Sequence, residues 1–73
     1  MKTQSLLLYG EIKKILPDNR FTVYSKQIER ESLCYLSGKL KRGPKPSEGD
    51  EVKFEVDSTN YQLGRIVAVR NLR

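Results

Sequence analysis

The chain has 73 residues, enough for one domain with one modest hydrophobic core and too few to enclose a deep substrate cleft. Hydrophobic residues make up 37% and charged residues 32%, which is typical of a small folded protein and not of a disordered one. Fourteen Lys and Arg against nine Asp and Glu give a net charge of +5, which favours a polyanionic partner such as nucleic acid or an anionic membrane surface. A basic surface without a specific partner is the alternative that charge alone leaves open.

The residues available for catalysis or metal binding are few. There is no histidine, and Cys34 is the single cysteine, so we expect no zinc site and no cofactor. Cys34 lies in the apolar run Leu33–Leu36, which predicts a buried and inert thiol rather than a nucleophile. Glu51, Glu55 and Asp57 alternate along a solvated strand face without a basic partner for acid–base work. The sequence therefore predicts a binding protein and not an enzyme.

The apolar run near the start of the sequence bears on localisation. Leu6–Leu8 is too short for the core of a signal peptide or for a membrane span. Cys34 has no second cysteine with which to form an internal disulfide. Together these features predict a protein of the reducing cytoplasm.

The first predicted strand runs from Leu6 to Leu16, with a bend at Gly10 that lets it curve around a small barrel. A helix over Glu11–Leu16 is the alternative, but six residues before a proline make a poor helix. Pro17–Asn19 predicts a turn, because proline presets φ and Asp and Asn tolerate the left-handed region. Phe21–Tyr24 follows as a second strand, which completes a predicted hairpin.

Three more strands are predicted after the polar connection Lys26–Glu31: Ser32–Leu36, Glu51–Asp57 and Gly64–Arg70. The segment EVKFEVD at Glu51–Asp57 alternates between apolar and charged residues, which indicates one buried face. A turn is expected at Ser58–Asn60, before the last strand.

An irregular connection is predicted at Lys39–Asp50, because its glycines and prolines block a long helix or a strand ladder. Residues 71–73 are expected to form a tail. Five short strands with an irregular connection after the third predict an all-β domain over residues 1–73, a five-stranded antiparallel Greek-key barrel of the OB type. An SH3-like barrel is the structural alternative. The expected core residues are Ile12, Phe21, Val23, Leu36, Val52, Phe54, Val56, Ile66 and Val67.

The densest positive charge lies in this irregular connection, at Lys39, Lys41, Arg42 and Lys45. Lys and Arg attract phosphates, and a loose loop can follow an irregular RNA backbone. A loop that is basic only for solubility is the alternative. Further basic residues lie elsewhere in the sequence and could converge on the loop in a small barrel: Arg20, Arg65, Arg70 and Arg73.

Three tyrosines are candidates to stack on bases, namely Tyr24, Tyr35 and Tyr61, whereas Phe21 and Phe54 are expected in the core. Burial with a satisfied hydroxyl is the alternative for each tyrosine. The aromatic residues are sparser than in cold-shock domains, so sequence-tolerant stacking on single-stranded nucleic acid has weak support.

Several pieces of the chain carry a family likeness in a fixed order. The family patterns are Leu-Pro followed by Phe-x-Val, Ser-Gly-Lys-hydrophobic-basic-basic, Gly-Asp-x-Val-x-Val-Glu and Gly-Arg-Ile-Val. The matching pieces are Gly10, LPDNRFTV (Leu16–Val23), LSGKLKR (Leu36–Arg42), EGDEVKFEV (Glu48–Val56) and GRIVAVR (Gly64–Arg70). From about Leu8 to Arg70 the chain resembles translation initiation factor one, the small S1-like OB-fold factor of bacteria.

Two segments depart from the family pattern. GPKPSE replaces an Asn-Tyr-Ile-Arg-Ile-like segment and is one residue shorter, so only Lys45 stands near an arginine that contacts ribosomal RNA in the family. The connection before Cys34 is one residue longer and lacks the usual Asn-Gly turn. A housekeeping factor and a diverged paralogue are therefore both compatible with the sequence.

The resemblance implies a monomeric initiation factor that binds the small ribosomal subunit in the decoding A site and assists two larger initiation factors. It assigns ribosomal RNA contacts to Lys39, Lys41 and Arg42 in the loop and to Arg65 and Arg70 near the end of the chain. Tyr35 falls where the family often has histidine, which implies a stacking position. The alternatives are a general cold-shock-like RNA-binding protein or RNA chaperone, and a small protein-interaction barrel.

Overall fold

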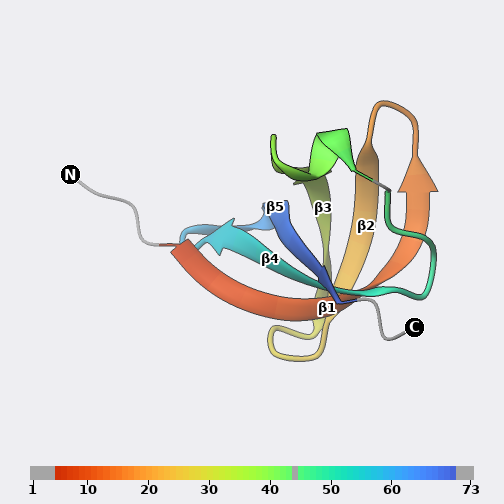
Figure 1. Cartoon of the computed structure of the whole chain (residues 1–73). Helices are drawn as coiled ribbons and strands as arrows, with labels where there is room; N and C mark the ends of the chain where they lie inside the picture. The colour runs from red at the N-terminus through yellow and green to blue at the C-terminus, as the bar shows by residue number, and fades with distance from the viewer. Residues whose placement is uncertain (1–4, 44, 71–73) are drawn as a thin grey trace.

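Five strands make up the fold, and the computed structural model describes residues 5–43 and 45–70. Figure 1 shows the strands wrapped into a barrel with a single helical turn at its upper end. All five predicted strands are present, and the predicted tail lies outside the described residues. The elements in chain order are β1 (Ser5–Leu16), β2 (Arg20–Ser25), β3 (Arg30–Leu36), the 3₁₀ turn η1 (Leu40–Arg42), β4 (Glu51–Asp57) and β5 (Asn60–Arg70).

Gly10 is the point at which β1 changes partner. Residues 5–11 pair with β4, and from residue 11 onward β1 pairs with β2. A Cβ atom at Gly10 would lie 2.6 Å from the Tyr24 carbonyl oxygen and 2.6 Å from Cγ1 of Val23, so the close approach of the strands needs a glycine. The register shift in the pairing of β1 with β2 lies further along, between Ile12 and Lys14, and the alternative helix at Glu11–Leu16 is wrong.

The hairpin between β1 and β2 has the predicted turn at residues 17–19. Asp18 and Asn19 have φ angles of 65° and 58°, in the left-handed region that Asp and Asn tolerate. This turn brings β2 back along the second half of β1, with Leu16 opposite Arg20.

The barrel closes because β5 pairs with β4 and β3 at once. The strand order is β1-β2-β3-β5-β4, and β4 returns to β1. Strand β5 is antiparallel to β4 but parallel to β3, with Leu33–Leu36 opposite Leu63–Ile66. The predicted all-antiparallel barrel is wrong at this one seam, because directions cannot alternate all the way around a closed ring of five strands. The order and pairing are those of the predicted OB barrel.

The interior of the barrel holds the predicted core, with one exception. The buried hydrophobic residues are Leu8, Ile12, Phe21, Val23, Cys34, Leu36, Val52, Phe54, Val56 and Ile66. Val67 is only partly buried, because Lys53 pairs with Ala68 and Phe54 with Ile66, a register shift that leaves Val67 without a partner on β4. The predicted burial of Cys34 is confirmed.

The connection from β3 to β4 is irregular as predicted, apart from η1. The backbone N–H of Leu40 donates to the Ser37 carbonyl oxygen, and the Leu40 side chain packs against the core. The chain then returns to β1, where the Gly49 N–H donates to the Ile12 carbonyl oxygen at 2.8 Å and the Ile12 N–H donates to the Asp50 carbonyl oxygen at 3.0 Å. Both ends of the connection are therefore fixed to the barrel.

Four strands begin earlier than predicted, β1 and β2 by one residue each, at Ser5 and Arg20. Strand β3 begins at Arg30 instead of Ser32, and β5 begins at Asn60 instead of Gly64. The turn before β5 is confined to Ser58 and Thr59, because Asn60 already pairs with β4. No helix within residues 5–43 and 45–70 is long and apolar enough to cross a membrane.

Candidate nucleic-acid interface

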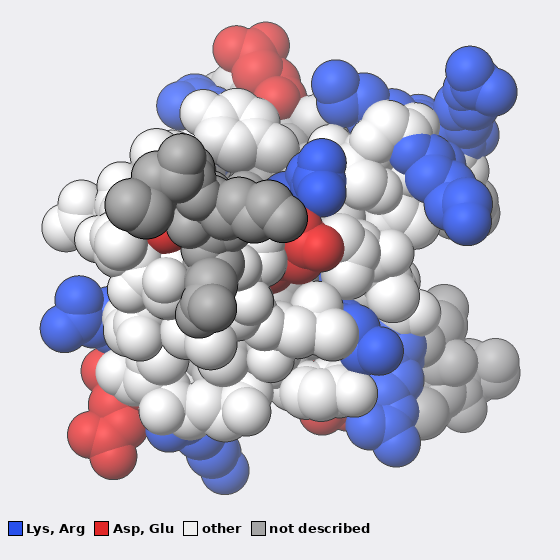
Figure 2. Space-filling model, turned by 90° about the vertical axis from the view of Figure 1, so that its left-hand side faces the viewer, with Lys and Arg blue, Asp and Glu red and all other residues white. Residues whose placement is uncertain are grey.

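The four basic side chains of the β3–β4 connection form what we call the basic loop: Lys39, Lys41, Arg42 and Lys45. All four residues are exposed, with Lys39 directly before η1 and Lys41 and Arg42 within it. Within the described ranges 5–43 and 45–70, none of the four joins an ion pair. Figure 2 shows Lys and Arg side chains gathered at the upper right of the face drawn, whereas acidic and basic groups mix over the rest of that face. Their charge is thus available to a polyanion.

Tyr35 lies between two arginines on neighbouring strands. Its Cα partner on β5 is Arg65, and its Cα partner on β2 is Arg20. Neighbouring strands are about 5 Å apart, so an aromatic ring and two cations stand side by side on the outside of the barrel. The Tyr35 residue is 45% exposed, and the chain continues from it directly into the basic loop. The structure therefore brings together Tyr35, Arg65 and the start of the loop.

Both arginines beside Tyr35 contact other groups of the protein. The Arg65 guanidinium lies 3.0 Å from the Glu55 carboxylate, and the two residues are Cα partners on β5 and β4. The Arg20 Nε donates to the Pro17 carbonyl oxygen at 2.9 Å. Both contacts are at the surface, so either arginine can exchange its partner for a phosphate at low cost.

Arg70 lies apart from this group. It pairs with Glu51 at the other end of the β4–β5 ladder, with 3.7 Å between guanidinium and carboxylate. Five positions along β5 separate Arg70 from Arg65, roughly 16 Å at about 3.3 Å per residue. The basic positions predicted as one phosphate-binding face thus occupy two regions of the barrel surface.

The other predicted stacking residues are less open than Tyr35. Tyr24 is partly exposed on β2, and Tyr61 is partly buried against the core. The backbone carbonyl oxygen of Tyr61 accepts a hydrogen bond from the Ser32 hydroxyl group, which ties the first part of β5 to β3.

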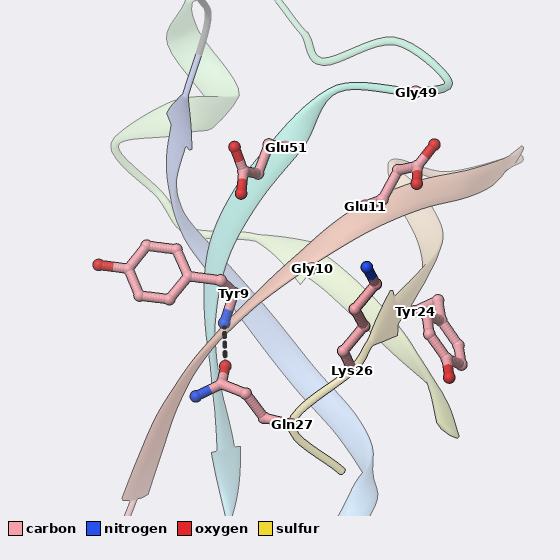
Figure 3. A pocket seen from close by; sticks show the side chains of 8 residues that line it. All are labelled: Tyr9, Gly10, Glu11, Tyr24, Lys26, Gln27, Gly49 and Glu51. Atoms are coloured by element: carbon pink, nitrogen blue, oxygen red, sulfur yellow. Dashed lines mark hydrogen bonds between the residues drawn. The ribbon is translucent and has the colours of Figure 1, made fainter. Parts of the chain in front are cut away.

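Sequence reasoning missed Tyr9, which is 45% exposed on β1. The backbone N–H of Tyr9 donates to Oε1 of Gln27 at 2.8 Å, and Figure 3 shows this contact between β1 and the β2–β3 turn. Leu6 and Leu8 face the core, so strand alternation would have placed Leu7 and Tyr9 outside. The signal was present, but Tyr9 follows an apolar run that reads as core.

Two surface hollows flank Tyr9. One, of about 410 Å³, is drawn in Figure 3 and is lined by Tyr9, Gly10, Glu11, Tyr24, Lys26, Gln27, Gly49 and Glu51. The other, of about 420 Å³, is lined by Tyr9, Lys53, Ala68, Val69 and Arg70. The Lys53 ammonium lies 5.6 Å from the centre of the Tyr9 ring. No group of three or more His, Cys, Asp or Glu within residues 5–43 and 45–70 is arranged to hold a metal ion.

Comparison with curated proteins identifies the family. The chain is 37% identical over 70 residues to the chloroplastic translation initiation factor IF-1 of Drimys granadensis and, at the same identity, to that of Calycanthus floridus var. glaucus. Each match covers 92% of this chain and 87% of the relative. The chain belongs to the translation initiation factor IF-1 family.

Solved structures agree with membership of the IF-1 family. The solution structure of the same factor from the Wolbachia endosymbiont strain TRS of Brugia malayi superposes with a TM-score of 0.68 at 30% identity, over 94% of this chain and 79% of that one. The crystal structure of YjeQ from Thermotoga maritima superposes with a TM-score of 0.72 at 28% identity, over 90% of this chain but only 23% of that one. No family model matches the sequence. The OB barrel and the initiation-factor family thus rest on the curated relatives and on the Wolbachia structure.

Proposed function

We propose that this IF-1 family member acts in the cytoplasm by binding the small ribosomal subunit at the decoding A site, through contacts to ribosomal RNA and without a catalytic step. Kinship with translation initiation factors over 92% of the chain carries the proposal. The exposed basic loop supports it, because four exposed cations on a connection fixed at both ends suit an irregular RNA cleft. In this role the protein, as a monomer, assists the other initiation factors.

The RNA-binding surface in this proposal consists of the basic loop with Tyr35 and Arg65. Lys39, Lys41 and Arg42 contact phosphates, and Tyr35 offers a ring for stacking between two arginines. Lys45 takes the place of the missing family arginine. Arg70 contributes long-range attraction, since it lies five positions along β5 from Arg65 and pairs with Glu51.

Binding to purified small subunits, large subunits and unstructured RNA tests the proposal, with and without an A-site competitor. We expect a preference for the small subunit that the competitor abolishes. If three to five phosphates are neutralised, log affinity should fall with log salt at a slope of roughly −2 to −5. Equal affinity for all three targets, unaffected by the competitor, would leave only the general RNA-binding protein or RNA chaperone. A slope near zero without ribosome association would favour a protein-interaction barrel.

Substitutions test which part of the protein surface binds the small subunit. The double substitution Lys41→Ala with Arg65→Ala should remove the small-subunit preference and make the salt slope shallower by about two units. The matched control is Lys14→Ala with Arg30→Ala, which removes one Lys and one Arg from exposed positions outside the proposed surface. An equal loss in the control would mean that net charge, not the loop, governs binding.

A further inference from the structure

The surface around Tyr9 lies away from the basic loop. Strand β3 has the β2–β3 turn before Arg30 and the basic loop after Leu36, so these segments lie at opposite ends of the strand, as Figure 1 shows. Tyr9 is tied to the β2–β3 turn by its hydrogen bond to Gln27. A ligand on Tyr9 therefore meets different residues from a ligand on the loop.

The Tyr9 ring has a cationic side. Lys53 is its Cα partner on β4, and the Lys53 ammonium lies 5.6 Å from the ring centre. On β5 the partner of Lys53 is Ala68, whose small side chain lines the hollow that also holds Arg70. Tyr9, Lys53, Ala68 and Arg70 thus form a continuous patch over three strands, which we call the Tyr9 surface.

The other hollow beside Tyr9 presents hydrogen-bonding groups of a different kind. Glu11 and Glu51 are Cα partners on β1 and β4, and both line it together with Gln27. Each carboxylate has a basic neighbour, Lys13 at 3.4 Å for Glu11 and Arg70 at 3.7 Å for Glu51. Carboxylate oxygens outside these contacts can accept hydrogen bonds from amino groups. Among the described residues, Lys26 is the one cation that lines this hollow.

Tyr9 borders one hollow that holds Lys53 and Arg70 and another that holds Glu11 and Glu51, and this set of groups is complementary to one nucleotide of a single strand. The base stacks on the ring, the phosphate meets the cations, and an exocyclic amino group donates to a carboxylate. We propose that the Tyr9 surface is a second RNA-binding site, which takes an unpaired nucleotide whose base carries an amino group.

The base chemistry supplies matched probes. Cytosine and uracil are pyrimidines of the same size, but cytosine has an N4 amino donor where uracil has an O4 acceptor, and acidic side chains accept from cytosine N4. The protein should therefore bind oligo(C) more tightly than oligo(U) of the same length. Equal affinity for the two would overturn the assignment of the carboxylate side of the site.

Substitution of the ring tests the site directly, with fluorescence anisotropy of labelled oligo(C) as the measurement. Tyr9→Thr keeps a residue that favours strands but removes the ring, and should weaken binding roughly 5- to 150-fold, the range for loss of one base-stacking contact. Tyr9→Phe keeps the ring and should bind within about twofold of the parent. Leu7→Thr is the matched control, because Leu7 is 50% exposed on the same strand and lies outside both hollows. An equal loss in Leu7→Thr, or none in Tyr9→Thr, would overturn the proposal.

A measurement on the unsubstituted protein covers the case in which Tyr9→Thr does not fold. Oligo(C) titrated into isotope-labelled protein should shift the backbone amide signals of Tyr9, Lys53 and Ala68. Shifts confined to the basic loop would place the oligonucleotide there and overturn the proposal.

This inference and the proposed function can fail separately. Tyr9→Thr should bind small subunits within about twofold of the parent, whereas Lys41→Ala with Arg65→Ala should lose small subunits and keep most of its affinity for oligo(C). Absence of small-subunit binding would refute the ribosomal role and leave the oligo(C) result intact. Absence of oligo(C) binding to the parent would refute only the Tyr9 site.

Discussion

Glu55 holds Arg65 on the outside of the barrel, with 3.0 Å between its carboxylate and the guanidinium and with Arg65 directly beside Tyr35. The Arg65 side chain is 59% exposed and that of Glu55 is 33% exposed. An RNA phosphate that binds Arg65 must compete with this carboxylate. In the proposed complex, the Glu55 carboxylate would thus lower the affinity of Arg65 for RNA.

Removal of the Glu55 charge should therefore strengthen binding to the small subunit. An exposed ion pair contributes about 0.2–1 kcal/mol, so Glu55→Gln should raise affinity about 1.5- to 5-fold, measured by anisotropy of labelled protein. Glu29→Gln is the control, because it makes the same charge change at an exposed residue of the β2–β3 turn. Equal gains in the two variants would mean that only net charge matters.

Gly10→Ala should destabilise the barrel by about 1–3 kcal/mol, the range for an overpacked core. The new Cβ would lie 2.6 Å from a backbone oxygen and 2.6 Å from a buried valine side chain, where neither neighbour can move freely. In Gly38→Ala the Cβ meets nothing within 4 Å, so stability should change by less than about 0.5 kcal/mol. Urea denaturation of both variants measures the difference, and equal midpoints would contradict the close approach at the bend.

Phe54→Ala should cost roughly 3–5 kcal/mol, most or all of the stability of a domain this small. The Phe54 residue is 0% exposed at the centre of β4. Leu63→Ala removes a hydrophobic side chain from a residue that is 50% exposed and should melt close to the parent. A Phe54→Ala melting temperature within one or two degrees of the parent would show that the core assignment is wrong.

Cys34 should react slowly with thiol reagents under native conditions. Desolvation by burial raises the pKa of the Cys34 thiol from 9.0 to about 12, so almost no thiolate is present at neutral pH. Modification then requires opening of the barrel, and its rate should rise steeply with urea. Rapid modification of the native protein, at the rate seen in denaturant, would refute this.

Asp57 makes the stability of the β4–β5 turn depend on pH. Its pKa lies below the ordinary 3.8 because its carboxylate accepts hydrogen bonds from the Thr59 backbone N–H and then from the Thr59 hydroxyl. Since the folded pKa is lowered, the stabilisation is present above the unfolded pKa and is lost as pH falls through the folded pKa. Thr59→Val keeps the N–H and removes the hydroxyl, so the Asp57 pKa should rise part of the way toward 3.8 in an NMR titration. An unchanged pKa would exclude a role for the hydroxyl.

Alternating sequence predicted the core where a strand has one buried face. In β4 the apolar residues Val52, Phe54 and Val56 alternate with charged residues, and these three apolar residues are the buried ones. In β5 the run of apolar residues hid a register shift, so Val67 was wrongly placed in the core. The start of β5 was missed because Asn60 is a turn former and residues 60–63 are exposed or partly exposed.

The candidate interface was predicted in composition but not in arrangement. The basic loop could be predicted because its four cations lie close together in sequence. Tyr35 stands beside Arg65 because β3 pairs with β5, and Arg70 lies nearer to Tyr9 because β4 pairs with both β1 and β5. Strand pairing between distant segments leaves no local signal in the sequence. The sequence alone therefore could not show that Arg65 and Arg70 lie in two different regions of the surface.

The parallel seam between β3 and β5 also bears on how quickly the barrel assembles. The β1–β2 hairpin joins neighbouring segments, and such hairpins form in microseconds. The seam instead joins Leu33 to Leu63, across a long loop whose closure entropy must be overcome first. Folding is therefore expected in the millisecond-to-second range of non-local β topologies. Until β5 docks, β3 presents an open edge, the state from which two copies could exchange strands.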